Sequence, residues 1–119
     1  MEIKLFDSEL KVMDILWEKG EMKAKDIADI LKEEVGWKKS TTYTVLKKCI
    51  EKIAIKRIEP NFICVPLISK TDVQAYETDE LIEKMYGGAT DQLIANLLGR
   101  NDLSPGEIKR LRQLVKELE

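Results

Sequence analysis

Residues 37–50 constrain this chain most, because at 100° per residue they form a helix with two chemically opposite faces. One face is mostly apolar and continues just past the segment, through Thr42, Val45, Leu46, Cys49 and Ile53. The opposite face carries hydroxyl groups and lysines, namely Ser40, Tyr43, Thr44, Lys47 and Lys48. Hydroxyl and ammonium groups are what a helix uses to contact phosphates and base edges in the major groove of DNA. The alternative at this point is a solvent-exposed helix that happens to be basic.

Positive charge is concentrated around this helix, although the chain of 119 residues has a net charge of −2. Residues 35–58 contain a single acidic side chain, Glu51. The basic side chains of the same segment are Lys38, Lys39, Lys47, Lys48, Lys52, Lys56 and Arg57. Residues 69–119, by contrast, contain more acidic than basic side chains. A local excess of positive charge in an otherwise acidic chain predicts a binding site for a polyanion.

The hydrophobic periodicity predicts three helices followed by a hairpin. Apolar stripes at helical spacing favour helices over 7–19, 24–34 and about 39–52. Alternation then favours strands over 55–59 and 62–65, with a turn at Pro60-Asn61. We therefore expect a winged helix-turn-helix DNA-binding domain over residues 1–68, in which the third helix enters the major groove and the hairpin flanks the DNA backbone. The residues expected to contact DNA are Lys38, Lys39, Ser40, Thr41, Thr42, Tyr43, Thr44, Lys47, Lys48, Lys56 and Arg57.

Residues 69–119 are expected to form three amphipathic helices with little core of their own. Burying about ten aliphatic side chains yields on the order of 15–30 kcal/mol, and ordering about fifty residues costs more. A partner surface is needed, and a second copy of the chain is the simplest partner. The residues expected at that dimerisation surface are Tyr76, Leu81, Met85, Leu93, Leu97, Ile108, Leu111, Leu114 and Leu118. The alternative is that these helices fold back on their own winged helix. The fold class is thus mostly α with a small β-wing.

Several classes of protein are disfavoured by what the sequence lacks. It contains no histidine, the commonest general base and metal ligand. Cys49 and Cys64 belong to no Cys-x-x-Cys motif, so we expect buried free thiols, no metal ion and no cofactor. No nucleophile motif or phosphate-binding loop points to an enzyme. No apolar run approaches 18 residues and no signal-peptide core is present, so we expect a cytoplasmic protein.

Two further alternatives concern the role of the predicted winged helix and of its aromatic residues. A winged helix used only for protein–protein contacts would have no need to place four lysines and several hydroxyls on one face. Trp17 and Trp37 could stack on bases, but Trp17 lies on an apolar stripe and Trp37 precedes the basic helix. Core packing is the favoured interpretation for Trp17, and a hydrophobic staple is the favoured one for Trp37. Tyr43 is predicted on the exposed face, where it could meet a thymine methyl group or a phosphate.

Residues 5–119 resemble the penicillinase repressor family (BlaI/MecI type). The matching segments are Asp-Ser-Glu-Leu-Lys-Val-Met-Asp-Ile-Leu-Trp at 7–17, the block 37–52 with Thr41, Thr44 and Leu46, Val-Pro-Leu-Ile-Ser at 65–69, Asp-Leu-Ser at 102–104, and Glu107-Ile108. The resemblance implies a homodimeric bacterial repressor that binds pseudo-palindromic double-stranded operator DNA.

The resemblance also implies how repression could end. In the better-known members, a membrane sensor-transducer for β-lactam antibiotics triggers proteolysis between an asparagine and a phenylalanine in the fifth helix. The matching positions are Asn96 and Leu97, so the asparagine is kept and the aromatic residue is not. Asn96 could equally be a polar residue on the outer face of the helix, in a repressor that responds to a signal other than β-lactams.

Two other departures from the family bear on structure and ligands. The family usually has glycine just after the third helix, where a positive φ ends the helix. Ile53 occupies that position, so either the helix continues or a β-branched residue is strained there. The copper-responsive branch of the family ends in a cysteine cluster that this chain lacks, so copper sensing is not expected.

Overall fold

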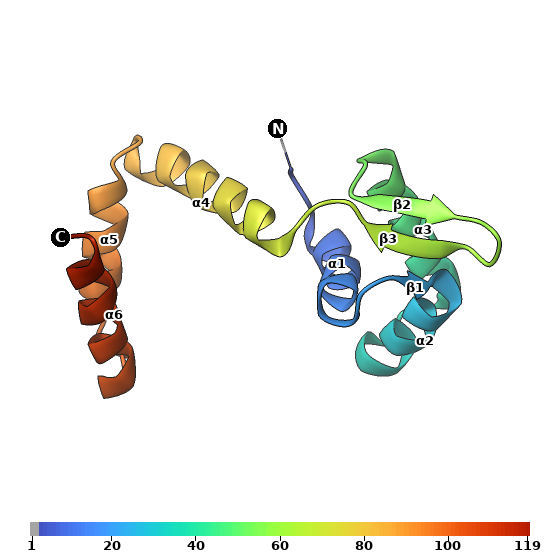
Figure 1. Ribbon diagram of the computed structural model, residues 1–119, viewed down its shortest axis with the longest axis horizontal. Helices are drawn as coiled ribbons and strands as arrows, with labels where there is room; N and C mark the ends of the chain where they lie inside the picture. Colours follow the sequence, from blue (N-terminus) through green and yellow to red (C-terminus); the bar gives the residue numbers. More distant parts are fainter. Residues whose placement is uncertain (1–2) are drawn as a thin grey trace. The chain divides into compact units, whose positions relative to one another are not determined.

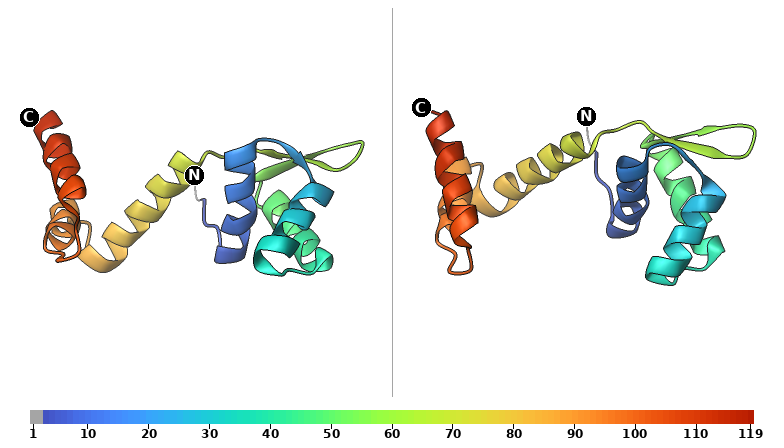
Figure 2. Two further views of the ribbon diagram at one scale, coloured as in Figure 1. Left: turned by 90° about the horizontal axis from the view of Figure 1, so that it is seen from below. Right: turned by 60° about the horizontal axis from the view of Figure 1, so that its bottom comes forward.

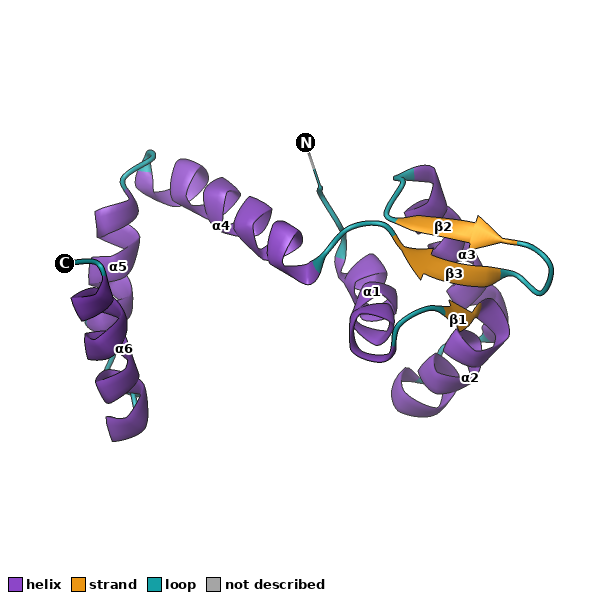
Figure 3. Cartoon of the chain, viewed as in Figure 1, coloured by secondary structure: helices purple, strands orange, loops and turns teal. Residues whose placement is uncertain are grey.

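The computed structural model describes residues 3–119, which form helices and a small sheet (Figures 1 and 3). The elements are α1 (Asp7–Lys19), β1 (Met22–Lys23), α2 (Ala24–Val35), α3 (Lys39–Glu51), β2 (Ile55–Ile58), β3 (Ile63–Pro66), α4 (Lys70–Tyr86), α5 (Thr90–Leu98) and α6 (Pro105–Glu117). Contacts divide the chain into two compact units, Met1–Asp79 and Glu80–Glu119. The expected class, mostly α with a small β-wing, is confirmed.

The boundary between the two units lies inside α4, later than the boundary after Ile68 that the sequence suggests. The first turns of α4 belong to the first unit because Val73, 3% exposed, packs into its core together with Ile68. The indole N–H of Trp17 donates a 2.9 Å hydrogen bond to the carbonyl of Ile68 and ties the end of the hairpin to α1. Trp17 thus packs against the core, as its apolar stripe predicts.

The sheet of the first unit is antiparallel and has the strand order β1-β3-β2. Met22 pairs with Cys64, and Arg57 on β2 also pairs with Cys64. The two-stranded hairpin expected from the sequence is present as β2 and β3, and the sheet contains a third strand, β1, that the sequence did not predict. A strand of two residues is too short to show alternation, so its pairing with β3 could not be read from the pattern. The β2–β3 hairpin projects beyond the helices in both views of Figure 2.

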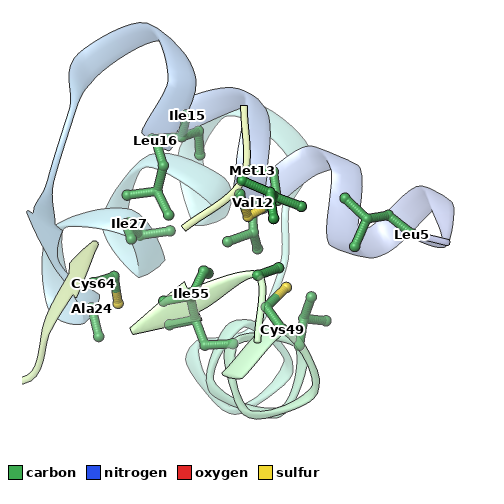
Figure 4. Close-up of a cluster of buried hydrophobic side chains, with 14 of the residues drawn as sticks. Leu5, Val12, Met13, Ile15, Leu16, Ala24, Ile27, Cys49, Ile55 and Cys64 are labelled. Atoms are coloured by element: carbon green, nitrogen blue, oxygen red, sulfur yellow. The ribbon is translucent and has the colours of Figure 1, made fainter. Parts of the chain in front are cut away.

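The core of the first unit lies between the three helices and the sheet (Figure 4). Met13 and Leu16 of α1, Ile27 of α2, Leu46 of α3 and Ile55 of β2 are each no more than 1% exposed. Full burial of such a side chain stabilises the fold by about 1.5–3 kcal/mol. Each helix therefore contributes its apolar stripe to one shared core, which fixes the face that α3 turns to solvent.

Ile53 follows the end of α3 with a φ of 61°. Its side chain is 67% exposed, although the sequence places it on the buried stripe of the third helix. The helix does not continue, and the family's glycine position carries a β-branched residue in the left-handed region. Such a conformation costs roughly 1–2 kcal/mol for a residue with a Cβ atom.

The second unit contains the end of α4 together with α5 and α6. Ser104 begins α6 with reciprocal hydrogen bonds of 3.1 Å: its Oγ accepts from the N–H of Glu107, and its own N–H donates to Glu107 Oε1. A capping box with Pro105 in the first turn is a typical helix start. Throughout residues 80–119, all of which the structure describes, no side chain is buried.

Candidate nucleic-acid interface

The orientation of α3 is set by the turn that precedes it. Gly36 adopts a φ of 80° after α2, and its N–H donates to the carbonyl of Lys32 at 3.1 Å. The N–H of Trp37 donates to the carbonyl of Leu31, and the Trp37 side chain packs partly buried against the core. A left-handed glycine at a helix end allows this reversal without a Cβ penalty. Trp37 is thus a packing residue at the entry to α3.

The solvent-facing side of α3 carries most of the expected DNA contacts. The exposed residues of this set are Lys38, Lys39, Ser40, Thr41, Thr44, Lys47 and Lys48. Val45, Leu46 and Cys49 are buried on the other side. The hydroxyl of Thr44 donates to the carbonyl of Ser40 at 2.9 Å, which leaves its oxygen lone pairs able to accept from a base edge. The two-faced character predicted for this helix is confirmed.

Thr42 does not belong to that exposed surface. It is 0% exposed, and its Oγ1 has no hydrogen-bond partner among the described residues. Its position on the apolar stripe explains this burial, because Thr42 precedes Val45 and Leu46 at helical spacing. The assignment of Thr42 as a DNA contact is therefore wrong.

Tyr43 is partly buried rather than fully outward. Its ring meets the ring of Phe62 edge to face, with centroids 5.7 Å apart and an interplanar angle of 71°. The ammonium of Lys39 lies 5.9 Å from the centroid of the Tyr43 ring. Tyr43 is thereby held between a lysine of its own helix and an aromatic residue of the wing.

The wing contributes two exposed cations, Lys56 and Arg57, both on β2. Arg57 stacks on Phe62, with its guanidinium carbon 3.7 Å from the ring centroid, and its Nε donates to a carboxylate oxygen of Glu59. Phe62 was not among the residues expected at the interface. The pattern gave it only a place in a strand, whereas its partners come from β2 and α3, which only the fold brings together.

Lys52 differs from the other lysines of the basic segment because its ammonium group pairs with a buried carboxylate. Its Nζ lies 2.7 Å from Glu9 Oε1 and 3.0 Å from the carbonyl of Lys4. Glu9 is 0% exposed, and the same Oε1 accepts from the N–H of Phe6 at 2.7 Å. The pair ties the end of α3 to α1, and this structural role sets Lys52 apart from the lysines expected to contact DNA.

The two thiols lie in the core of the first unit and are free. Burial, reinforced by the negative charge of Glu9 and opposed by Lys52, raises the pKa of Cys49 to about 12. Burial likewise raises the pKa of Cys64 to about 11, opposed by Arg57. Both groups are therefore protonated at neutral pH and are poor nucleophiles.

The residues expected at the dimerisation surface lie along α4, α5 and α6. Leu81, Met85, Leu97, Ile108, Leu114 and Leu118 are exposed in the single chain, while Tyr76, Leu93 and Leu111 are partly covered. An open apolar groove runs between the end of α5 and α6, lined by Leu98, Leu103, Ile108, Leu111 and Val115. Asn96 and Leu97 are both exposed within α5.

The geometry is that of a winged helix with a basic, hydroxyl-rich third helix, and comparison with known proteins gives it a family. The family model described as penicillinase repressor matches residues 5–117. The chain belongs to the penicillinase repressor family. Members of this family are DNA-binding transcriptional repressors and are not enzymes.

Two relatives in the penicillinase repressor family match nearly the whole chain. The penicillinase repressor of Bacillus licheniformis is 25% identical over 116 residues, covering 96% of this chain and 91% of that protein. The methicillin resistance regulatory protein MecI of Staphylococcus aureus (strain N315) is 27% identical over 116 residues, covering 96% and 94%. The match therefore includes both the winged helix and the C-terminal helices.

Solved structures of the repressor BlaI share the fold. The solution structure of its DNA-binding domain gives a TM-score of 0.56 at 24% identity, covering 60% of this chain and 90% of that chain. The monomeric form of Bacillus licheniformis BlaI in complex with the blaP half-operator gives a TM-score of 0.52, with the same identity and coverage.

Two negative findings apply to residues 3–119 of this penicillinase repressor family member. No helix there is long and apolar enough to cross a membrane. Within the same range, histidine, cysteine, aspartate and glutamate side chains form no group of three or more that could hold a metal ion.

Proposed function

We propose that this repressor acts as a homodimer on pseudo-palindromic operator DNA in the cytoplasm, with α3 in the major groove and the wing against the backbone. The observation that carries the proposal is the exposed face of α3, where Ser40, Thr41, Thr44 and Lys47 lie together while the apolar face is buried. Hydroxyls and lysines at these positions can contact base edges and flanking phosphates at once.

We assign the phosphate contacts to the cations at the two ends of this surface. Lys38 and Lys39 lie at the start of α3, Lys48 near its end, and Lys56 and Arg57 on the wing. Phosphate contacts set the position of the protein on the duplex and carry most of its affinity. Base discrimination then falls to Thr41, Tyr43, Thr44 and Lys47.

The proposed dimer is supported by the second unit. Its helices turn aliphatic side chains to solvent, among them Met85 at 64%, Leu98 at 52% and Leu118 at 84% exposure. An unpartnered helical unit without a buried side chain cannot offset the entropy of ordering its backbone. A second copy would cover this surface with its own identical stripes and would place two α3 helices on two half-sites.

The proposal is tested by titrating the full-length protein against a duplex that it has selected from a random-sequence pool. With roughly six to ten phosphate contacts per dimer, affinity should fall by about three to five orders of magnitude between 50 and 200 mM salt. Analytical ultracentrifugation in parallel should report two chains per duplex. A salt slope near zero, or selection of no duplex, would contradict the DNA-binding proposal.

We further propose, from family resemblance alone, that proteolysis at Asn96–Leu97 is the means of release to be tested first. Its trigger would be a membrane sensor-transducer of the kind that serves the better-known members. Both residues are exposed in α5, and a cut there would separate α6 from the rest of the chain. The competing proposal is a repressor that answers a different signal.

A further inference from the structure

Phe62 makes three contacts, one with α3, one with β2 of the wing and one with the start of α2. Its ring packs edge to face on Tyr43 of α3, with centroids 5.7 Å apart. The guanidinium carbon of Arg57 lies 3.7 Å over the same ring. The carbonyl of Phe62 accepts a 2.9 Å hydrogen bond from the N–H of Ala24, at the start of α2. One side chain therefore touches both a proposed phosphate-binding cation and a proposed base-reading residue.

The backbone of the hairpin turn is held in an unusual conformation that fixes this arrangement. Asn61 has a φ of 75° and Phe62 a φ of 48°, both in the left-handed region. Residues other than glycine rarely adopt this region unless surrounding contacts impose it, and such positions cluster at functional sites. Phe62 makes its hydrogen bond to Ala24 and its packing on Tyr43 from this conformation.

The sheet register explains why Arg57 reaches Phe62 and its neighbour Lys56 does not. Arg57 pairs with Cys64, and paired residues on adjacent strands point to the same face of a sheet. Cys64 is buried, so that face is the one turned toward the core. Lys56 is one residue earlier, on the opposite face, because side chains alternate along a strand. The wing thus has one cation coupled to α3 and one free of it.

We propose that Phe62 is a positioning residue for sequence-specific DNA binding, holding Arg57 and Tyr43 as one rigid assembly. The inference rests on the proposed DNA-binding function. A phosphate bound by Arg57 fixes the wing on the duplex, and Phe62 carries that constraint to the ring of Tyr43 over the bases. A phosphate contact that ordinarily carries no sequence information would thereby contribute to base discrimination.

The first test compares binding of the full-length variants to the wild-type-selected duplex and to a random duplex. Phe62→Leu keeps an apolar side chain but removes the ring, and should lower the preference for the selected duplex about fivefold. Phe62→Tyr keeps the ring and should restore the preference. Lys56→Gln, the matched wing control, should weaken binding to both duplexes equally. Equal weakening by Phe62→Leu on both duplexes would overturn the inference.

The second test leaves Phe62 in place and measures coupling between its two neighbours. Tyr43→Leu and Arg57→Gln are measured singly and together on the selected duplex. The double variant should bind at least about threefold more tightly than the product of the two single losses predicts, because either change alone already breaks the shared assembly. For Lys56→Gln combined with Tyr43→Leu, the loss of affinity should equal the product of the two single losses. A full product for Arg57→Gln with Tyr43→Leu would overturn the inference even if Phe62→Leu fails to fold.

Failure of the inference and failure of the proposed function give different results. A wild-type protein that selects no duplex removes the proposed function. A wild-type protein that selects a duplex but shows no coupling between Tyr43 and Arg57 removes only the role of Phe62. Thermal unfolding of each variant, followed by circular dichroism, identifies the variants whose fold is intact.

Discussion

Thr42 and Thr44 are two residues apart on α3 and have opposite environments. Thr42→Val replaces a buried hydroxyl that lacks a partner among the described residues with a methyl group of the same size. This change should stabilise the first unit by about 1 kcal/mol, because an unsatisfied buried polar group costs about 1–3 kcal/mol. Urea unfolding at neutral pH measures the gain, and binding to the selected duplex should not change.

The same substitution at Thr44 is the matched control. Thr44 is exposed on the proposed base-reading face, so Thr44→Val should leave stability nearly unchanged. It should cost about 1–3 kcal/mol on the selected duplex and little on random DNA. Lost discrimination in Thr42→Val instead would return Thr42 to the interface and show that the buried position does not describe the DNA-bound protein.

Ile53 offers a second test at a single position. Ile53→Gly should raise the free energy of unfolding by about 1 kcal/mol, because relief of left-handed strain exceeds the added entropy of the unfolded chain. The side chain is 67% exposed, so little packing is lost. Ile53→Ala removes the atoms beyond Cβ but keeps Cβ, the source of the strain, and should give no gain. A destabilised glycine variant in chemical denaturation would mean that the Ile53 side chain has a role beyond its own strain.

Among the elements, α6 gives the clearest prediction about assembly. Leu114→Glu places a charge on the apolar stripe that a second copy is proposed to cover, where an unpaired charge is strongly disfavoured. Sedimentation should show monomers, with affinity for a full operator reduced to that of a half-site. Gln113→Glu adds the same charge to an exposed polar position of α6 and should leave the dimer intact. Equal dimerisation of both variants would exclude this stripe from the interface.

The helices could be located from the sequence because each has a full apolar stripe and a clear end signal. Gly20, Gly36 and Gly87-Gly88 follow the ends of α1, α2 and α4, where glycine commonly ends a helix. The strand β1 could not be found, since two residues carry no period and the pairing partner is far along the chain. The end of the first unit could not be predicted either. Val73 lies on an apolar stripe typical of any amphipathic helix, and the stripe does not reveal which core it packs into.

The candidate site was only partly accessible to the same reasoning. Helical spacing identified the exposed face of α3, including Thr44 and Lys47. It could not assign Lys52, which the charge count includes with the basic segment, because the buried partner Glu9 comes from α1. Nor could it identify Phe62, whose contacts with Tyr43 and Arg57 depend on the packing of the hairpin against α3.

For the whole molecule, the proposed release by proteolysis predicts that the chain is cut in induced cells. α5 has nine residues and no side chain buried within the single chain, so whenever the two proposed copies separate it can open locally at low cost and admit a protease. Mass spectrometry of the protein from β-lactam-treated cells should show a new terminus after Asn96, and the fragment should lose both dimer and operator. An intact chain with undiminished repression would favour a different signal.

The stability of the first unit should fall in alkaline solution because of its two thiols. Burial raises their pKa from 9.0 to about 12 for Cys49 and about 11 for Cys64, so the folded chain holds protons that the unfolded chain releases. Their contribution is complete below about pH 9 and is lost as pH rises toward 11–12. Between pH 8 and 10 the loss should be about 1 kcal/mol per thiol. Urea unfolding of a Cys49→Ala, Cys64→Ala variant should show a flatter pH profile.

The placement of these thiols also makes their rate of chemical modification a measure of how often the first unit opens. Both cysteines of the chain lie in the first unit, and the second unit has none. A disulfide reagent can react only when the core around Cys49 and Cys64 opens. The rate of modification therefore reports the frequency of those openings and does not depend on motion of α5 and α6. Bound DNA should lower the rate of thiol modification, whereas separation of the two copies should leave it at the rate of the free winged helix.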